Sequence, residues 1–154
     1  MKITILKACL IGILTAFSIS AYSGPAVSDY DKVIKEYITS HMNGDYKILR
    51  KIMNDDATFK IPRAEKVIVQ DKHDIVNAMK QGGGIKQNCE CSYEVVAKSS
   101  ALVMVRVDFR YDNCVQQNFL VLEKNDKEWQ IAQVYKIFND KEPGMDAPKV
   151  IANN

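Results

Sequence analysis

Few of the side chains in this sequence of 154 residues have the spacing of acid–base or nucleophilic catalysts. Both histidines, His41 and His73, precede the strand-rich half of the chain, so a Ser-His-Asp or Cys-His arrangement has few ways to form. Glu94 is the only carboxylate that the strand pattern directs inward, where loss of solvent raises a carboxyl pKa; the alternative is a solvated position at a sheet edge. His41 ends a predicted helix, where it serves either as a proton shuttle or as a partner of the helix dipole. No paired carboxylates are evident, so Glu94 and His41 are the only catalytic candidates.

Three cysteines follow residue 23: Cys89, Cys91 and Cys114. An odd number permits at most one internal disulfide, and alternation along the strands places Cys89 and Cys91 on the face opposite to Cys114. Cys89 and Cys114 are also nearly two strand spacings apart, about 9 to 10 Å, which is too far for the usual disulfide. We therefore expect free thiols.

The C-x-C spacing lacks the two-residue gap of zinc knuckles and a fourth ligand, so neither a metal nor another cofactor is predicted.

Helical periodicity predicts three helices that would help to position these side chains. The first ends at Asn43-Gly44, and Asp45 caps a short second helix. Residues 57–61 and 67–69 are typical of short strands, and residues 71–80 of a third helix. The run Gly82-Gly83-Gly84 could cradle a phosphate, but no strand–loop–helix order surrounds it, so a flexible connection is favoured. The first helix buries one stripe of side chains: Tyr30, Val33, Ile34, Tyr37, Ile38 and Met42.

Four long strands follow, over residues 89–98, 102–111, 114–123 and 128–138, and the short polar turns between them predict an antiparallel meander. If each turn holds two residues, alternation sorts the side chains onto two faces. The face expected to pack under the helices carries Val96, Val103, Val105, Val107, Phe109, Leu120, Leu122, Trp129 and Ile131, with Glu94, Asn118, Gln133 and Tyr135 among them. The other face is apolar enough to predict a homodimer surface, although a half-apolar face can also lie in water. It carries Tyr93, Val95, Leu102, Met104, Phe119, Val121, Ala132 and Val134, with Arg106, Asp108, Gln117 and Gln130.

Residues 1–23 are typical of a cleaved secretory signal. They contain Lys2 and Lys7, no acid, an apolar stretch over residues 8–19 and small residues before a cleavage site near Ser23. A retained anchor is the alternative, but the stretch is shorter than the roughly 20 residues of a spanning helix. The two lysines account for the formal net charge of +2, so the remaining chain is neutral. We expect a periplasmic or secreted protein without nucleic-acid or membrane partners after cleavage.

The order of these elements resembles the nuclear-transport-factor-2-like superfamily, a cone-shaped α+β fold with a pocket between helices and sheet. Four segments carry the resemblance: Tyr37-Ile38, Asn43-Gly44-Asp45, residues 55–59 (Asp-Asp-Ala-Thr-Phe) and Trp129-Gln130-Ile131. It covers residues 27–138, preceded by the signal peptide over 1–23 and followed by a flexible tail over 139–154. Small secreted bacterial proteins labelled as lumazine-binding, together with SnoaL-like proteins, are the most similar subfamilies.

The ketosteroid isomerases of this superfamily provide a test for catalysis. Tyr37 matches the tyrosine that they use as an oxyanion donor, and Asn118 matches the protonated aspartate that is their second donor. Their general base is an aspartate before a proline, and the matching residue here is Ile61, which cannot accept a proton. The resemblance therefore implies a pocket that lacks this enzyme's base.

The sequence thus predicts an α+β cone, with three N-terminal helices on a curved antiparallel sheet, that binds a small, partly apolar or aromatic molecule or serves as an interaction domain. A third possibility is a purely structural domain whose own side chains fill the cone. The alternative enzyme is an isomerase, dehydratase or cyclase that uses Glu94 or His41 on a small hydrophobic substrate. The expected pocket residues are Tyr37, Phe59, Asn118, Leu120, Trp129, Gln133 and Tyr135.

Overall fold

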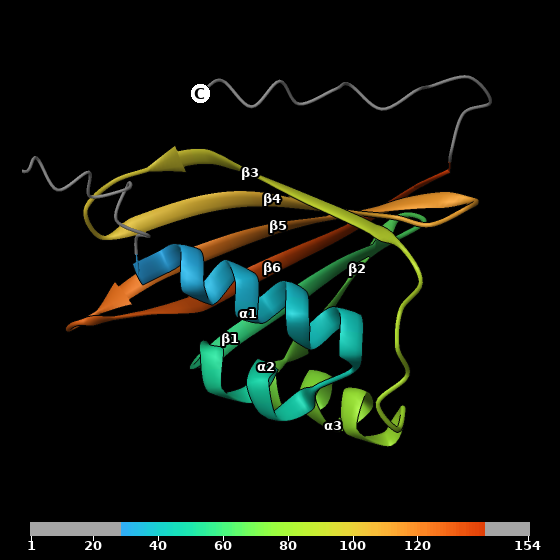
Figure 1. Cartoon of the computed structure of the whole chain (residues 1–154), viewed down its shortest axis with the longest axis horizontal. Coiled ribbons are helices and arrows are strands. Elements are labelled where there is room, and N and C mark those ends of the chain that lie inside the picture. The colour runs from blue at the N-terminus through green and yellow to red at the C-terminus, as the bar shows by residue number, and fades with distance from the viewer. Residues whose placement is uncertain (1–28, 141–154) are drawn as a thin grey trace, which may run out of the picture.

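The computed structural model describes residues 29–140 as three helices and one six-stranded sheet. In Figure 1 the sheet is curved, and the helices lie on its concave side. This arrangement confirms the predicted α+β fold. The helices are α1 (Asp29–Asn43), α2 (Tyr46–Ile52) and α3 (Lys72–Gln81). The strands are β1 (Met53–Arg63), β2 (Lys66–Asp71), β3 (Glu90–Lys98), β4 (Leu102–Arg110), β5 (Cys114–Asn125) and β6 (Glu128–Asp140).

The junction between α1 and α2 depends on a glycine. Gly44 has φ +63°, a conformation that costs a residue with a Cβ about 1 to 2 kcal/mol. A Cβ at this position would also lie 2.8 Å from the Cα of Gly84 in the loop after α3. Asp45 then begins α2, because its side chain accepts hydrogen bonds from the backbone N–H groups of Lys47 and Ile48. The predicted helix break at Asn43-Gly44 and the cap at Asp45 are therefore confirmed.

The sheet contains one parallel pair that the meander prediction did not include. Its strand order is β2-β1-β6-β5-β4-β3, and β1 runs parallel to β6 while all other neighbours are antiparallel. β1 is also longer than the predicted strand over residues 57–61, because it begins directly where α2 ends. The last strand of the described part, β6, therefore lies inside the sheet and joins the β1–β2 hairpin to the other three strands.

Two β-bulges reverse which side chains face the helices. In β3 the pairing with β4 shifts around Val96, and in β6 the pairing with β5 shifts around Ala132. An extra residue in one strand turns every side chain beyond it to the other face. Cys91, Tyr93 and Val95 consequently share the concave face with β4 residues such as Val107, and Val96 is 56% exposed instead of lying in the core.

The core lies between α1 and the middle of the sheet. Val33, Ile34 and Tyr37 form the buried stripe of α1, as the helical spacing predicted. The facing sheet residues were also assigned to the correct face, and each is no more than 1% exposed: Val103, Val105, Val107, Phe109, Leu120, Leu122 and Ile131. Val134 joins them on the concave face, contrary to prediction, because it follows the β6 bulge.

The described residues leave some predictions untested. The predicted signal peptide and its cleavage site lie outside residues 29–140, as does most of the predicted tail. Asn139 and Asp140, the first residues of that tail, belong to β6. None of the helices within the described part of the chain combines the length and apolar character needed to cross a membrane.

Candidate functional site

A chain of three buried polar side chains crosses from β5 to α1 on the concave face. Gln116 donates its amide N–H to Asn118 Oδ1 at 3.0 Å, and Asn118 Nδ2 donates to the Tyr37 hydroxyl oxygen at 2.8 Å. Asn118 is completely buried and Tyr37 almost so. Buried polar groups require hydrogen-bond partners, and these two hydrogen bonds provide a partner for each of the three side chains. The hydroxyl proton of Tyr37 has no acceptor among residues 29–140, and the residue itself is only 2% exposed.

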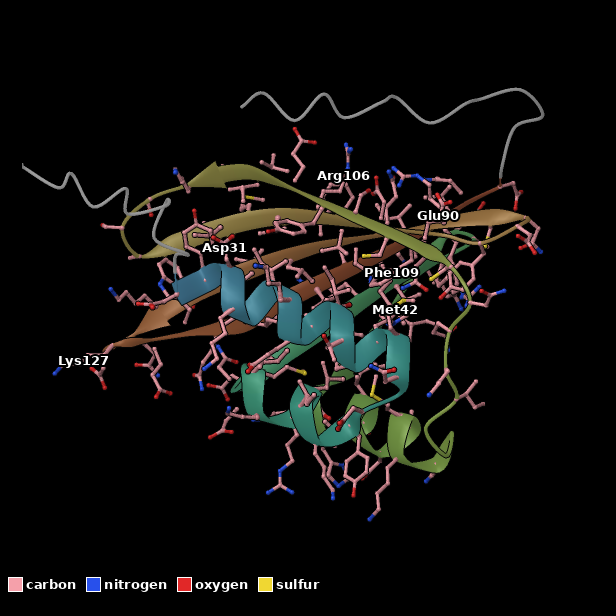
Figure 2. All side chains as sticks on the ribbon, in the orientation of Figure 1. Asp31, Met42, Glu90, Arg106, Phe109 and Lys127 are labelled. Atoms are coloured by element: carbon pink, nitrogen blue, oxygen red, sulfur yellow. The ribbon has the colours of Figure 1, made fainter. Side chains whose placement is uncertain are left out.

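A second chain begins at the C-terminal end of α1. Tyr111 donates its hydroxyl proton to Gln87 Oε1 at 3.1 Å, and its oxygen lies 3.0 Å from His41 Nε2. Because the Tyr111 proton is already used, Nε2 of a neutral His41 carries the hydrogen of this second bond. The imidazole also packs on the Phe109 ring, with 4.0 Å between centroids. Figure 2 shows Phe109 between the sheet and α1, so this contact fixes His41 against the core.

Lys136 brings a positive charge to the concave face. It pairs with Asn118 across the β5–β6 ladder, and its Nζ lies 5.2 Å from the centroid of the Phe59 ring. Burial lowers the pKa of Lys136 to about 8. Burial, followed by the charge of Lys136, lowers the pKa of His41 to about 4. His41 is therefore neutral at pH 7, whereas Lys136 is mostly charged.

The other titratable groups near these chains remain protonated at neutral pH. Burial raises the pKa of Tyr37 and also raises that of Tyr111 to about 12. Burial likewise raises the pKa of the Cys91 thiol to about 11. The site consequently presents neutral hydrogen-bond donors and one amine, which suits the recognition of a carbonyl or an anionic group.

Three residues predicted to point into the cone lie on the outer face. Glu94 pairs with Arg106 across the β3–β4 ladder, and its carboxylate lies 3.4 Å from the Arg106 guanidinium. Gln133 and Tyr135 bond to each other on the outer side of β6, where the Tyr135 hydroxyl donates to Gln133 Oε1 at 2.9 Å. The prediction was wrong in each case for one reason: all three residues lie beyond a bulge that the alternation pattern does not reveal.

The remaining predicted pocket residues separate into core and periphery. Tyr37 and Asn118 meet directly, and Phe59 lies beneath Lys136, so these three share the candidate site. Leu120 is fully buried in the core. Trp129 is near the β5–β6 turn, where its ring meets Tyr30 edge-on at 5.8 Å between centroids, about two helical turns of α1 from Tyr37.

The predicted outer face is also partly wrong. Leu102, Met104, Phe119 and Val121 do lie on it, since they alternate with the buried residues of β4 and β5. Tyr93, Val95 and Val134 point instead toward the helices because of the bulges. Between these apolar side chains, the half-buried Arg106 and Arg110 bind the carboxylate of Asp108 at 3.4 and 3.5 Å. Figure 2 shows Arg106 on the side of the sheet away from α1.

The cysteines have a different arrangement from the one predicted. Cys91 is on the concave face opposite Phe109, and Cys114 pairs at the end of the next hairpin with the same orientation as Gln116. The expectation that they face opposite sides was wrong because of the Val96 bulge. All three cysteines are free in the structure, and Cys89 Sγ contacts Met42 Sδ at 3.5 Å.

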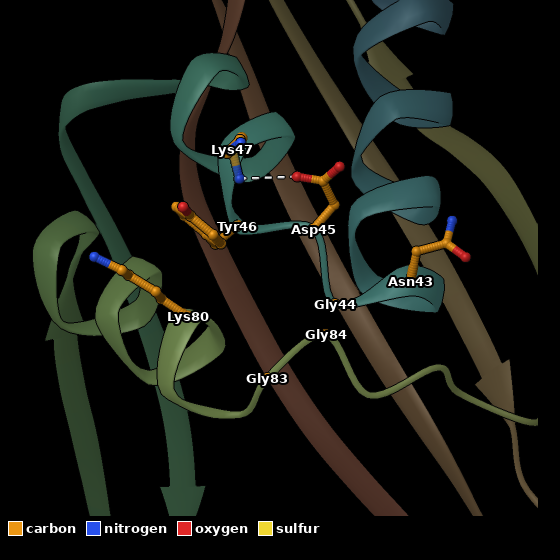
Figure 3. A pocket seen from close by; sticks show the side chains of 8 residues that line it. All are labelled: Asn43, Gly44, Asp45, Tyr46, Lys47, Lys80, Gly83 and Gly84. Atoms are coloured by element: carbon orange, nitrogen blue, oxygen red, sulfur yellow. Dashed lines mark hydrogen bonds between the residues drawn. The ribbon is translucent and has the colours of Figure 1, made fainter.

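A pocket of about 380 Å³ opens beside the α1–α2 junction (Figure 3). It shares no residue with the two hydrogen-bonded chains. Its lining residues are Asn43, Gly44, Asp45, Tyr46, Lys47, Lys80, Gly83 and Gly84. Asp45 is already used as a helix cap, and the Lys80 ammonium lies over the Tyr46 ring, so the pocket has no built anion cradle.

One group of possible metal ligands occurs at the start of α3. Asp71, His73 and Asp74 place ligand atoms within 4.8 Å of one another, and all three residues are exposed. Asp71 accepts the backbone N–H of Asp74 as the helix cap, and His73 contacts Asn77. These local roles account for the cluster without a cation.

Sequence reasoning missed Gln87, Tyr111, Gln116 and Lys136. The available signal for Gln116 was the polar run over residues 116–118 of β5, in which it lies two positions from Asn118 and shares its face. Lys136 was hidden by the β6 bulge, which reverses its expected orientation. Gln87 lies in the segment between α3 and β3, where no periodicity applies.

Comparisons with known proteins agree with this architecture. An NTF-2 like protein of unknown function from Silicibacter pomeroyi superposes with a TM-score of 0.63 at 12% identity, over 73% of this chain and 95% of that one. An NTF2-like protein of unknown function from Shewanella baltica gives 0.61 at 14% identity, over 75% and 98%. A ketosteroid isomerase-like protein from Erwinia carotovora atroseptica gives 0.59 at 16% identity, over 75% and 95%. At these identities the likeness concerns the fold alone.

Sequence comparison provides the family. No curated protein matches the chain. The family model described as "Putative lumazine-binding" matches residues 26–139, which is most of the sequence and includes α1, α2, α3 and nearly all of the sheet. The chain therefore belongs to this lumazine-binding-like family and has the nuclear-transport-factor-2-like fold.

Proposed function

We propose that this domain binds a small, partly apolar or aromatic molecule on its concave face and does not transform it. The observation that best supports this proposal is the hydrogen bond between Asn118 and Tyr37. It places a hydroxyl proton without an acceptor among the described residues beside a completely buried amide. Such a pair can bind a carbonyl oxygen, and the buried Phe59 ring lies under Lys136 on the same face. The family description and the ketosteroid isomerase-like neighbour support a ligand-binding role for the domain.

The chemistry of the side chains favours binding over catalysis. Ile61 lies two residues beyond Phe59 on the same face of β1, at the position where the isomerases carry their base. Glu94 is on the outer face and is paired with Arg106, so it cannot reach Tyr37. Only His41 remains for the alternative isomerase, dehydratase or cyclase, and a pKa near 4 makes its imidazole a weak base at neutral pH.

Ligand screening with two matched tyrosine variants tests the proposal. Thermal-shift and native mass spectrometry screens would include lumazine, flavin-like, steroid-like and other aromatic compounds. We expect a ligand whose affinity falls about tenfold in Tyr37→Phe, because one hydrogen bond to the ligand is lost. Tyr135→Phe removes a hydroxyl from the outer face and should leave the affinity unchanged. Absence of any ligand, or equal losses in the two variants, would contradict the proposal.

We also propose that the domain is exported and dimerises through its outer sheet face. Leu102 and Met104 are 37% and 40% exposed there, and they precede the Arg106–Asp108 ion pair on the same face of β4. Burial of such a mixed surface is typical of subunit contacts. Cell fractionation with N-terminal sequencing tests the export step, and an intact N-terminus in the cytoplasm would contradict it.

A further inference from the structure

Two cations lie on aromatic rings where β1 and β6 meet on the concave side. Lys136 Nζ is 5.2 Å from the Phe59 centroid, and the Arg63 guanidinium carbon is 5.2 Å from the Phe138 centroid. Arg63 follows Phe59 and Ile61 in the alternation of β1, while Phe138 follows Lys136 in that of β6. The two charges therefore belong to one strip of the sheet.

Neither cation has an acidic partner within residues 29–140. The ion pairs within the described residues are formed by other cations, namely Lys51, Lys72, Arg106 and Arg110. Lys136 also has no hydrogen-bond acceptor there, although its side chain is half-buried. Holding a charge away from water without a counterion is unfavourable, and the lowered pKa of Lys136 reflects that cost. An anion that binds beside Lys136 would supply the missing counterion and remove this energetic cost.

The surroundings of Lys136 define which kind of anion fits. Phe59 is in the core, whereas Phe138 is 45% exposed and offers its ring to a bound molecule. Asn118, opposite Lys136 on β5, connects the strip to the free hydroxyl proton of Tyr37. The site thus combines a positive charge, an accessible aromatic ring and a neutral donor.

We propose that Lys136, assisted by Arg63, binds the negatively charged group of an aromatic or apolar organic acid on the concave face. This inference rests on the proposed function and specifies its ligand class: the molecule carries a carboxylate, sulfonate or comparable anion next to an apolar ring system. Tyr37 then binds a second polar atom of the same molecule.

A matched pair of fluorescent probes tests the two ideas separately. 8-Anilinonaphthalene-1-sulfonate and N-phenyl-1-naphthylamine share one ring system, and only the first carries a charge. We expect the full chain to bind both and to prefer the sulfonate. Lys136→Gln should weaken sulfonate binding about tenfold and change binding of the neutral probe less than about twofold. Lys136→Arg should restore the preference, and Lys127→Gln, at the distant β5–β6 turn, should have no effect.

Each outcome has a distinct meaning. If the neutral probe binds and Lys136→Gln leaves the sulfonate affinity unchanged, the anion site is refuted while the apolar ligand site stands. If Lys127→Gln weakens sulfonate binding as much as Lys136→Gln, general surface charge explains the preference and the anion site is again refuted. If neither probe binds, the proposed function and the anion site both fail.

Discussion

Replacing Lys136 with methionine should make the folded protein more stable at neutral pH. The amine is half-buried on the concave face without a counterion among the described residues, so the fold is less favourable while the amine is charged. A pKa of about 8, against 10.5 for an ordinary lysine, corresponds to at most about 3 kcal/mol. Partial solvation and the contact with Phe59 reduce this penalty, so we expect a gain of about 1 to 2 kcal/mol.

The pH dependence separates this cause from simple gain of apolar contact. Below pH 8 the amine is charged in both states, and the full penalty applies. Between pH 8 and 10.5 the unfolded chain binds the proton more strongly than the folded chain, so the wild-type protein regains stability as the pH rises. At pH 10 the advantage of Lys136→Met should therefore fall to about a quarter of its value at pH 7.

Urea unfolding followed by circular dichroism at pH 7 and pH 10 measures both quantities. Lys127→Met is the matched control, because that lysine is exposed at the β5–β6 turn and its replacement should change stability by less than about 0.5 kcal/mol. No stabilisation of Lys136→Met at pH 7, or an equal gain at both pH values, would refute the argument from burial of the charge.

Three other predictions follow from particular contacts. Gly44→Ala should lower the free energy of urea unfolding by at least about 1 kcal/mol more than Gly83→Ala does. Both glycines have positive φ, but of the two only Gly44 has neighbouring backbone where a Cβ would lie. Equal losses of stability would contradict this close approach. The pKa of His41 is lower in the folded than in the unfolded state, so the free energy of unfolding should fall as the pH drops from 6.5 to 4. On acidification from pH 7 to pH 5, His41→Gln should lose about 1 kcal/mol less of this free energy than the wild type. Identical acid profiles would exclude His41 as the cause. Met104→Lys should shift sedimentation from dimer to monomer while Ile85→Lys, in a loop, does not; a monomeric wild type would exclude the dimer.

The sequence predicted the fold well where periodicity is uninterrupted. The buried stripe of α1, the Asp45 cap and the β4–β5 register all follow from spacing alone, because a two-residue turn at Asp112-Asn113 gives the observed pairing of Arg110 with Val115. Tyr37 and Asn118 lie 81 positions apart in the chain, so only a family resemblance could bring them together in advance.

The residues assigned to the wrong face of the sheet lie at or beyond the bulges. A bulge adds one residue to one strand, so that two residues oppose one on the partner, and it is defined only by the pairing of the two strands. No pattern within β3 or β6 therefore marks Val96 or Ala132 as the extra residue. The β3 bulge places Glu94 on the outer face, and the β6 bulge places Tyr135 outward and Lys136 inward. The expected ligand pocket therefore loses Glu94 and Tyr135 and gains a cation.

The central position of β6 also has consequences for how the chain folds. Both neighbours of this last strand, β1 and β5, are made earlier, but β1 stays without its partner on that side until residues 128–140 are available. Pairing of β1 with β6 closes a loop of more than half the domain, which is a slow, non-local step. A chain that ends before β6 retains two unjoined sheets with exposed strand edges, which makes it prone to aggregation. Folding of this domain therefore depends on β6, so the concave face forms only after residues 128–140 have been synthesised.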